Sequence, residues 1–115
     1  ACEALRNKGF DGGLTLIGAE PHLPYDRPPL SKQLLSGEFA PDQIQLRKPE
    51  AFGDLRVELR LGDAAVSLDT SAKRVHLADG ADVGYDGLIL APGASARRLP
   101  NQPALRGIHD LRTME

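Results

Sequence analysis

The side chains that could do chemistry in this chain gather between Leu14 and Lys32, in the run LTLIGAEPHLPYDRPPLSK. Leu14, Leu16 and Ile17 predict a short buried strand, and Glu20 follows that strand directly. The carboxyl end of a strand is where doubly wound sheets bind their ligands, and a carboxylate there can accept hydrogen bonds from both hydroxyls of a ribose. The spacing therefore indicates a nucleotide site, for which one acid-ended strand is weak support on its own.

A stiff basic loop follows this predicted strand. Three prolines between Pro24 and Pro29 fix the backbone and remove hydrogen-bond donors. Such a loop can present Arg27 and Lys32 to an anion or to an electron-rich ring. A solvated turn in front of a short helix is the structural alternative, and the two roles can coexist.

That short helix can begin in two ways. Ser31 could cap it, or Pro28 and Pro29 could occupy its first positions. In either case we expect it to pass through Leu35 and to end at Gly37.

The residues before Glu20 carry a further prediction. In the dinucleotide-binding fingerprint the ribose-binding acid follows a glycine-rich phosphate loop by about 20 residues. Only nineteen residues precede Glu20, and they begin with ACEALRNKGF, which has helical spacing and a C-terminal cap at Gly9. We therefore expect the first strand and the phosphate loop to be missing, and the chain to be a fragment.

The second half of the sequence has the pattern of short strands. Alternation over residues 57–61 predicts a strand, and further strands are expected at 65–68, 74–77 and 87–90. A short helix or a turn is expected before them, at 49–53. Asp79-Gly80 is a hairpin signal, so the polar-edged strands predict an antiparallel meander. Leu88 to Leu90 is instead a continuous apolar run, which is typical of a buried parallel strand.

Composition excludes several classes of function. The 115 residues carry a formal net charge of -2, with neither the basic stripe nor the aromatic residues of a nucleic-acid-binding protein. No apolar run reaches the roughly 18 residues of a membrane span, and the N-terminus does not resemble a signal peptide, so we expect a cytoplasmic protein. Cys2 is the single cysteine and the three histidines lack ligand spacing, so we expect no disulfide within the chain and no metal site.

The order of the motifs resembles that of one family, the FAD-dependent pyridine nucleotide-disulfide oxidoreductases, and within it the ferredoxin reductase branch of putidaredoxin and rubredoxin reductases. The matching segments are, in chain order, LTLIGAE, PYDRPPLSK, VELRLGDAAVSLD, RVHLADG, YDGLILAPGA and GIHDLRT. The resemblance implies an α/β fold: residues 1–115 would form a partial FAD/NAD(P)-binding, Rossmann-like domain. That domain would combine a parallel sheet with an antiparallel β-meander and lack the first strand and phosphate loop.

The resemblance also implies roles for individual residues. Glu20 would bind the ribose in the adenosine half of FAD. Lys32 would lie near the flavin ring and stabilise electron density on it as a positive charge, not as a nucleophile. The positions that match cofactor contacts are Glu20, Arg27, Pro28, Lys32, Ala65, Val66, Ala91, Gly93 and Arg112. Three other arginines are explained equally well as surface charges: Arg97, Arg98 and Arg106.

Two features limit what this resemblance implies. The family's usual Ala-Thr-Gly is replaced by Ala91-Pro92-Gly93, which removes a hydroxyl and a backbone donor. Cys2 lies away from the position of the redox-active cysteines of related branches, so thiol chemistry is disfavoured.

For the intact parent, the resemblance implies an FAD-dependent ferredoxin–NAD(P)+ reductase that passes electrons from NAD(P)H through FAD to a ferredoxin or rubredoxin. We expect the chain alone to be inactive and not to bind FAD tightly, because the phosphate loop is missing. An inactive structural fragment and an apoptosis-inducing-factor-like regulatory flavoprotein are the alternatives. An unpaired sheet edge could also recruit a second copy, as a homodimer or by strand exchange.

Overall fold

The computed structural model of the chain describes residues 1–97, 100–101 and 105–114. These residues fall into two units, which we describe separately: unit 1 is Ala1–Pro24 with Arg47–Ile89, and unit 2 is Tyr25–Leu46 with Leu90–Glu115. The elements of unit 1 are α1 (Cys2–Asn7), β1 (Leu14–Gly18), α2 (Pro49–Asp54), β2 (Val57–Leu61), β3 (Ala65–Asp69), β4 (Arg74–Leu77) and β5 (Asp82–Gly84). Those of unit 2 are two short 3₁₀ helices, η1 (Pro28–Ser31) and η2 (Pro41–Ile44).

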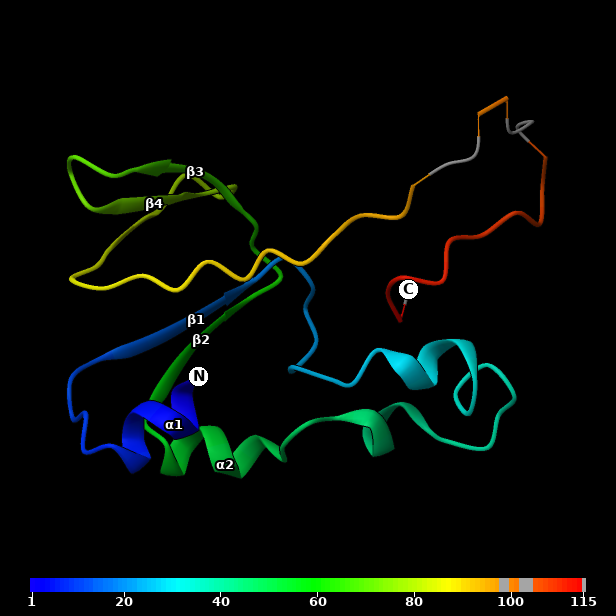
Figure 1. Cartoon of the computed structure of the whole chain (residues 1–115), viewed down its shortest axis with the longest axis horizontal. Coiled ribbons are helices and arrows are strands. Elements are labelled where there is room, and N and C mark those ends of the chain that lie inside the picture. The colour runs from blue at the N-terminus through cyan, green and yellow to red at the C-terminus, as the bar shows by residue number, and fades with distance from the viewer. Residues whose placement is uncertain (98–99, 102–104, 115) are drawn as a thin grey trace. The chain divides into compact units, whose positions relative to one another are not determined.

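Strands β1 and β2 form a parallel pair, in register from Leu14 opposite Val57 to Gly18 opposite Leu61 (Figure 1). In β2 the apolar residues are half-buried and alternate with exposed Glu58 and Arg60, so the period-2 pattern predicted this strand correctly. The strand predicted at Leu14 is likewise confirmed.

The amino end of this parallel pair is held by one side chain of α1. The guanidinium of Arg6 donates hydrogen bonds to four main-chain carbonyls: Leu55 at 2.8 Å, Phe10 at 2.7 Å, Gly12 at 2.8 Å and Arg56 at 3.1 Å. It also lies 5.7 Å from the centroid of the Phe10 ring. Arg6 thus joins the end of α1, the loop before β1 and the loop between α2 and β2, using the several donors that only arginine offers.

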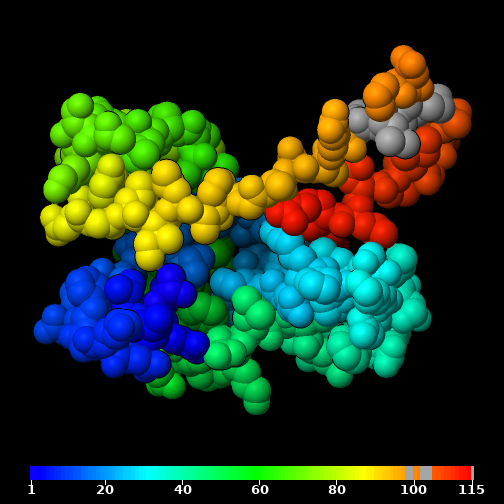
Figure 2. Space-filling view, in the orientation of Figure 1, coloured from blue at the N-terminus to red at the C-terminus, as the bar shows by residue number. Residues whose placement is uncertain are grey.

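Strands β3, β4 and β5 form the predicted antiparallel meander, with β4 in the middle. In Figure 2 the atoms of these strands, coloured green to yellow, lie packed against one another. Val75 and Leu77 of β4 are buried and belong to the small core of unit 1. The hairpin predicted at Asp79-Gly80 is confirmed: Gly80 has φ +90°, and the Asp79 carboxylate accepts the N–H of Ala81 at 2.6 Å.

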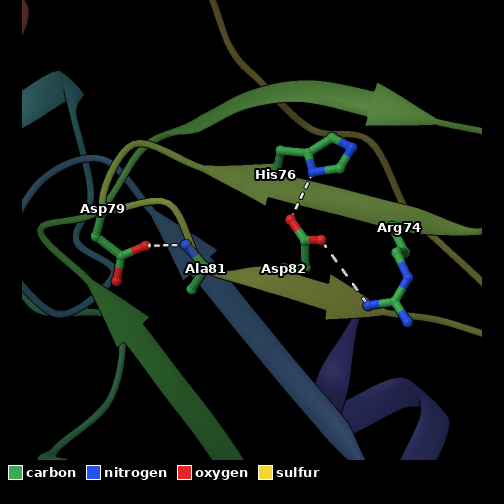
Figure 3. Close-up of polar contacts among 5 residues, drawn as sticks. All are labelled: Arg74, His76, Asp79, Ala81 and Asp82. Atoms are coloured by element: carbon green, nitrogen blue, oxygen red, sulfur yellow. Dashed lines mark hydrogen bonds and ion pairs between the residues drawn. The ribbon is translucent and has the colours of Figure 1, made fainter.

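A cross-strand polar group lies on the outer face of the meander (Figure 3). The carboxylate of Asp82 contacts Nδ1 of His76 at 2.5 Å and the Arg74 guanidinium at 3.9 Å. All three side chains are more than a third exposed, so solvent weakens these contacts.

The prediction of a strand at residues 87–90 is wrong. The third strand of the meander is Asp82–Gly84, and residues 87–90 belong to no strand. Ile89 and Leu90 are 65% and 70% exposed. An apolar run becomes a buried strand only where a sheet edge pairs with it, and no described residue pairs with this segment.

The helix predicted to end at Gly37 is also shorter than expected. Pro28 and Pro29 occupy the first positions of η1, which confirms the second of the two predicted starts. Ser31 is the last residue of η1 and does not cap it. Turns continue from there to Gly37, which has φ +77°. The 3₁₀ geometry suits so short an element, which buries a single side chain, Leu30.

Unit 2 has a second buried side chain that fixes the start of the basic loop. Ile44 of η2 is 3% exposed, and its carbonyl accepts the N–H of Asp26 at 2.8 Å. Next to this bond Tyr25 and Gln45 form an isolated antiparallel bridge. The backbone leading into Arg27 is therefore held by its pairing with residues 44–45.

Candidate functional site

Glu20 lies where the sequence predicts it, at the carboxyl edge of the parallel pair. Its main-chain carbonyl accepts the N–H of Gly62 at 3.0 Å, and the carbonyl of Gly18 accepts the N–H of Asp63 at 3.3 Å. Gly62 has φ +79°, and a Cβ built on it would lie 3.6 Å from Cβ of Pro21. These bonds continue the pairing of β1 and β2 past their ends and place half-buried Glu20 at that edge.

Asp63 connects this edge to the meander. Its carboxylate accepts the N–H of Asp79 at 3.1 Å, and the carbonyl of Ala64 accepts the N–H of Ala78 at 2.9 Å. The sequence analysis did not select Asp63. Its position two residues after the end of a predicted strand, like that of Glu20, was the signal available.

Ala65 and Val66 follow Asp63 at the start of β3. All five residues of β3 are exposed, and the pairing with β4 is irregular between Ala65 and Ser67. A bulge leaves the extra residue outside the ladder, and Val66 is 62% exposed. The start of β3 is therefore exposed, and its contact with a cofactor stays a prediction.

In unit 2 the structure brings together three of the predicted site residues. We call Tyr25, Arg27, Gly93 and Arg112 the arginine cluster. Nη1 of Arg27 donates to the Tyr25 hydroxyl at 3.1 Å and to the main-chain carbonyl of Arg112, and the guanidinium lies 5.0 Å from the centroid of the Tyr25 ring. Figure 2 shows the residues near the C-terminus, in red, lying on the segment that contains Arg27, in cyan.

Gly93 is required at its position in the cluster. It has φ +69°, and a Cβ built on it would lie 2.8 Å from Nη2 of Arg112. The absence of a side chain therefore lets the Arg112 guanidinium approach the backbone of the Ala91-Pro92-Gly93 turn. Among the residues that the structure describes, no carboxylate forms an ion pair with Arg112. A half-buried guanidinium beside a tight turn suits an anionic or electron-rich ligand.

Lys32 and Pro28 lie at opposite ends of η1. The ammonium of Lys32 is 3.5 Å from the carbonyl of Pro28, and both residues are exposed. The charge of Lys32 is thus held near the start of η1 by a weak contact that a ligand could replace. Ala91 is exposed in its turn, and Arg98 lies outside the described residues.

Two carboxyl groups of unit 1 have shifted pKa values. The N–H groups of Ala72 and Ser71 hold the pKa of Asp69 below its ordinary value of 3.8. A hydrogen bond from Arg47 lowers the pKa of Glu3 in the same way. Neither residue is one of the predicted cofactor contacts.

The described residues contain no helix long and apolar enough to cross a bilayer. They also contain no group of three metal-ligating side chains. The arrangement is instead a parallel pair with an acid at its carboxyl edge, an antiparallel meander and a basic loop, which confirms the α/β class predicted from the sequence.

Comparison with known proteins identifies this arrangement as that of an FAD/NAD(P)-binding reductase fold. The solved structure of the covalent putidaredoxin reductase–putidaredoxin complex superimposes with a TM-score of 0.80 and 34% identity, over 85% of this chain and 24% of that one. The model of the pyridine nucleotide-disulphide oxidoreductase family matches residues 1–115. The chain belongs to this family.

Two similar relatives fall in the branch that the motif order indicated. Rhodocoxin reductase of Rhodococcus erythropolis is 46% identical over 114 residues, which is 98% of this chain. A ferredoxin–NAD(P)+ reductase of a Sphingomonas species is 43% identical over 111 residues, or 96% of this chain. The chain spans 27% of the length of each relative.

Proposed function

We propose that residues 1–115 supply part of the FAD-binding domain of a reductase that passes electrons from NAD(P)H to a ferredoxin- or rubredoxin-type protein. The arginine cluster carries this proposal. It holds two guanidinium groups and a glycine turn together, within the span of residues over which the relatives match this chain. Such a group of donors fits the electron-rich and anionic parts of a flavin dinucleotide.

The proposal assigns each site residue a task. The Glu20 carboxylate would accept the hydroxyls of the adenosine ribose, and the exposed start of β3 at Ala65 and Val66 would face the adenine. The bound flavin would supply the chemistry that accepts a hydride and releases single electrons. Lys32 would place its positive charge near the flavin ring, where negative charge develops on reduction.

The remaining contacts are proposed for the turn and the loop. Arg112 would donate to FAD from its place beside Gly93, and Ala91 would approach the cofactor through its backbone. Arg27 and Pro28 would form the wall beside it. Because Pro92 has no N–H, we propose that Arg112 supplies the donor that this turn lacks.

A chimera tests the proposal without depending on where this chain begins or ends. Residues 1–115 would replace the matching segment of rhodocoxin reductase, and the purified chimera would be examined for its flavin absorbance and for NADH-driven reduction of a dye and of a ferredoxin. We expect stoichiometric FAD and reduction of both acceptors. A folded chimera without flavin would refute the proposed FAD site.

The same samples separate the proposal from its alternatives. A chimera that holds FAD but reduces the ferredoxin negligibly would favour a regulatory flavoprotein of the apoptosis-inducing-factor type. The 115-residue chain by itself, offered FAD, is expected to remain colourless and inactive. A yellow stoichiometric complex of that chain would contradict the expectation that it binds FAD weakly.

A further inference from the structure

Tyr25 makes two different contacts with one guanidinium. Its hydroxyl accepts a hydrogen bond from Nη1 of Arg27 at 3.1 Å, and its ring lies 5.0 Å below the Cζ atom of that group. A hydrogen bond at the rim of the ring together with a cation–π contact at its face fixes both the position and the orientation of the Arg27 guanidinium.

The backbone of Tyr25 is itself anchored. Tyr25 forms a bridge with Gln45, and the next residue bonds to the carbonyl of Ile44, which is almost completely buried. The aromatic ring therefore has a fixed base. A ring with two rotatable bonds loses little further entropy when it holds a partner.

Arg27 also bonds to a part of the chain that is distant in sequence. The same Nη1 donates to the carbonyl of Arg112, 85 residues away, and the Arg112 guanidinium lies at Gly93. These contacts form a continuous series from Tyr25 through Arg27 to the Arg112 backbone.

We propose that Tyr25 is a positioning residue that acts through Arg27 to hold Arg112 at the Gly93 turn. Tyr25 need not touch a ligand to do this. The inference rests on the proposed function where it concerns FAD, since Arg112 is the residue assigned to the cofactor. The proposed contacts within the chain exist without any ligand, so they can be tested separately.

The first test uses the 115-residue chain without cofactor. Nitrogen-15 NMR of the Arg27 side chain, assigned by the loss of its signals in Arg27→Lys, reports whether the guanidinium rotates freely. We expect separate, slowly exchanging Nη signals in the unchanged chain. Tyr25→Phe should partly average them, because the ring remains, and Tyr25→Leu should merge them. Unchanged separate signals in Tyr25→Leu would overturn the inference.

The second test uses the chimera with rhodocoxin reductase and measures the Kd of FAD and the midpoint potential of the bound flavin. We expect FAD to bind about threefold more weakly in Tyr25→Phe and about tenfold more weakly in Tyr25→Leu. In an Arg27→Ala background Tyr25→Leu should have no further effect, because Tyr25 acts through Arg27. Tyr85→Phe, on unit 1, is the matched control and should leave both quantities unchanged.

The outcomes distinguish the two ideas. Absence of FAD from the unsubstituted chimera would refute the proposed function and leave the NMR result to decide the role of Tyr25. Normal FAD binding with fully additive effects of Tyr25→Leu and Arg27→Ala would refute the positioning role alone.

Discussion

Unit 1 and unit 2 are held together in different ways. Unit 1 consists largely of paired strands, in which regular backbone hydrogen bonds run from β1 to β2 and across the meander. In its described residues, unit 2 has two 3₁₀ helices of four residues each and no strand of a sheet. Its two segments are joined by a side chain, Arg27, that bonds to the backbone of residue 112. The contrast shows that regular backbone ladders hold most of unit 1, whereas side-chain contacts of arginine join the two segments of unit 2.

Arginine also holds a crucial point of unit 1, which makes the comparison sharper. Arg6 bonds to four carbonyls at the amino end of the parallel pair, while the predicted ligand residue Glu20 lies at the opposite end. Within the described part of the chain, the structural arginine thus bonds to carbonyls and lies over a ring, whereas Arg112 lies at a turn with no described carboxylate partner. The surroundings, and not the residue type, distinguish the structural arginine from the one proposed to bind a ligand.

The largest expected effect comes from removing the Arg6 side chain, which bonds to four carbonyls of unit 1. Arg6→Ala leaves four carbonyls without their donor, two of them at partly buried bonds, so we expect the free energy of unfolding to fall by about 3 kcal/mol. Arg6→Lys should recover less than half, because an ammonium cannot reach four acceptors. Urea denaturation of the chimera followed by circular dichroism measures this, and Lys8→Ala, exposed beside α1, is the control. If Arg6→Ala and Lys8→Ala lower the free energy of unfolding equally, the four hydrogen bonds of Arg6 do not stabilise unit 1 as proposed.

The corresponding substitution in unit 2 should affect binding more than folding. Arg27→Ala removes the contacts to Tyr25 and to the Arg112 backbone, and we expect a loss of about 2 kcal/mol of FAD affinity, or about 30-fold in Kd. Flavin fluorescence titration of the chimera measures it. Exposed Arg106→Ala removes the same charge from the same unit and should change the Kd less than twofold. If both variants weaken FAD alike, general charge and not the cluster is responsible.

A smaller effect is expected at the glycine turn. In Gly93→Ala the alanine must adopt φ +69°, which is strained for a residue with a side chain, and its Cβ pushes the Arg112 guanidinium aside. We therefore expect FAD to bind about 1 kcal/mol more weakly, or about fivefold in Kd. Gly87→Ala is the matched control, because open space surrounds Gly87 and its φ is ordinary. The same titration compares the two, and an unchanged Kd in Gly93→Ala would show that Arg112 does not need this approach.

The smallest effect concerns the pH dependence of unit 1. The pKa of Asp69 is lowered in the folded chain by the N–H groups of Ala72 and Ser71, so the unfolded chain binds more protons near pH 3.8. The stabilisation from this turn is therefore complete above that range and is lost as the pH falls through the lowered pKa. Asp69→Asn should remove this part of the acid dependence. Thermal midpoints at several pH values between about 2.5 and 6 measure it, with exposed Asp86→Asn as the control.

The sequence by itself determined most of unit 1 and supplied the candidate site residues. Local patterns were sufficient there: alternation for β2, an apolar run for β1, and Asp79-Gly80 for the hairpin. The order of the motifs also indicated the family before any fold was known. Each of these signals is contained in a short stretch of sequence.

Only the tertiary structure decided which distant residues meet. It left residues 87–90 outside any strand, because an apolar run needs a pairing edge that its own sequence cannot supply. It brought Arg27 to the carbonyl of Arg112 and Arg112 to Gly93. It also placed Tyr25 against the Arg27 guanidinium, a contact that the motif alone did not reveal. Spacing along the chain fixes contacts within a few residues, whereas a contact across 85 residues depends on how the whole unit folds.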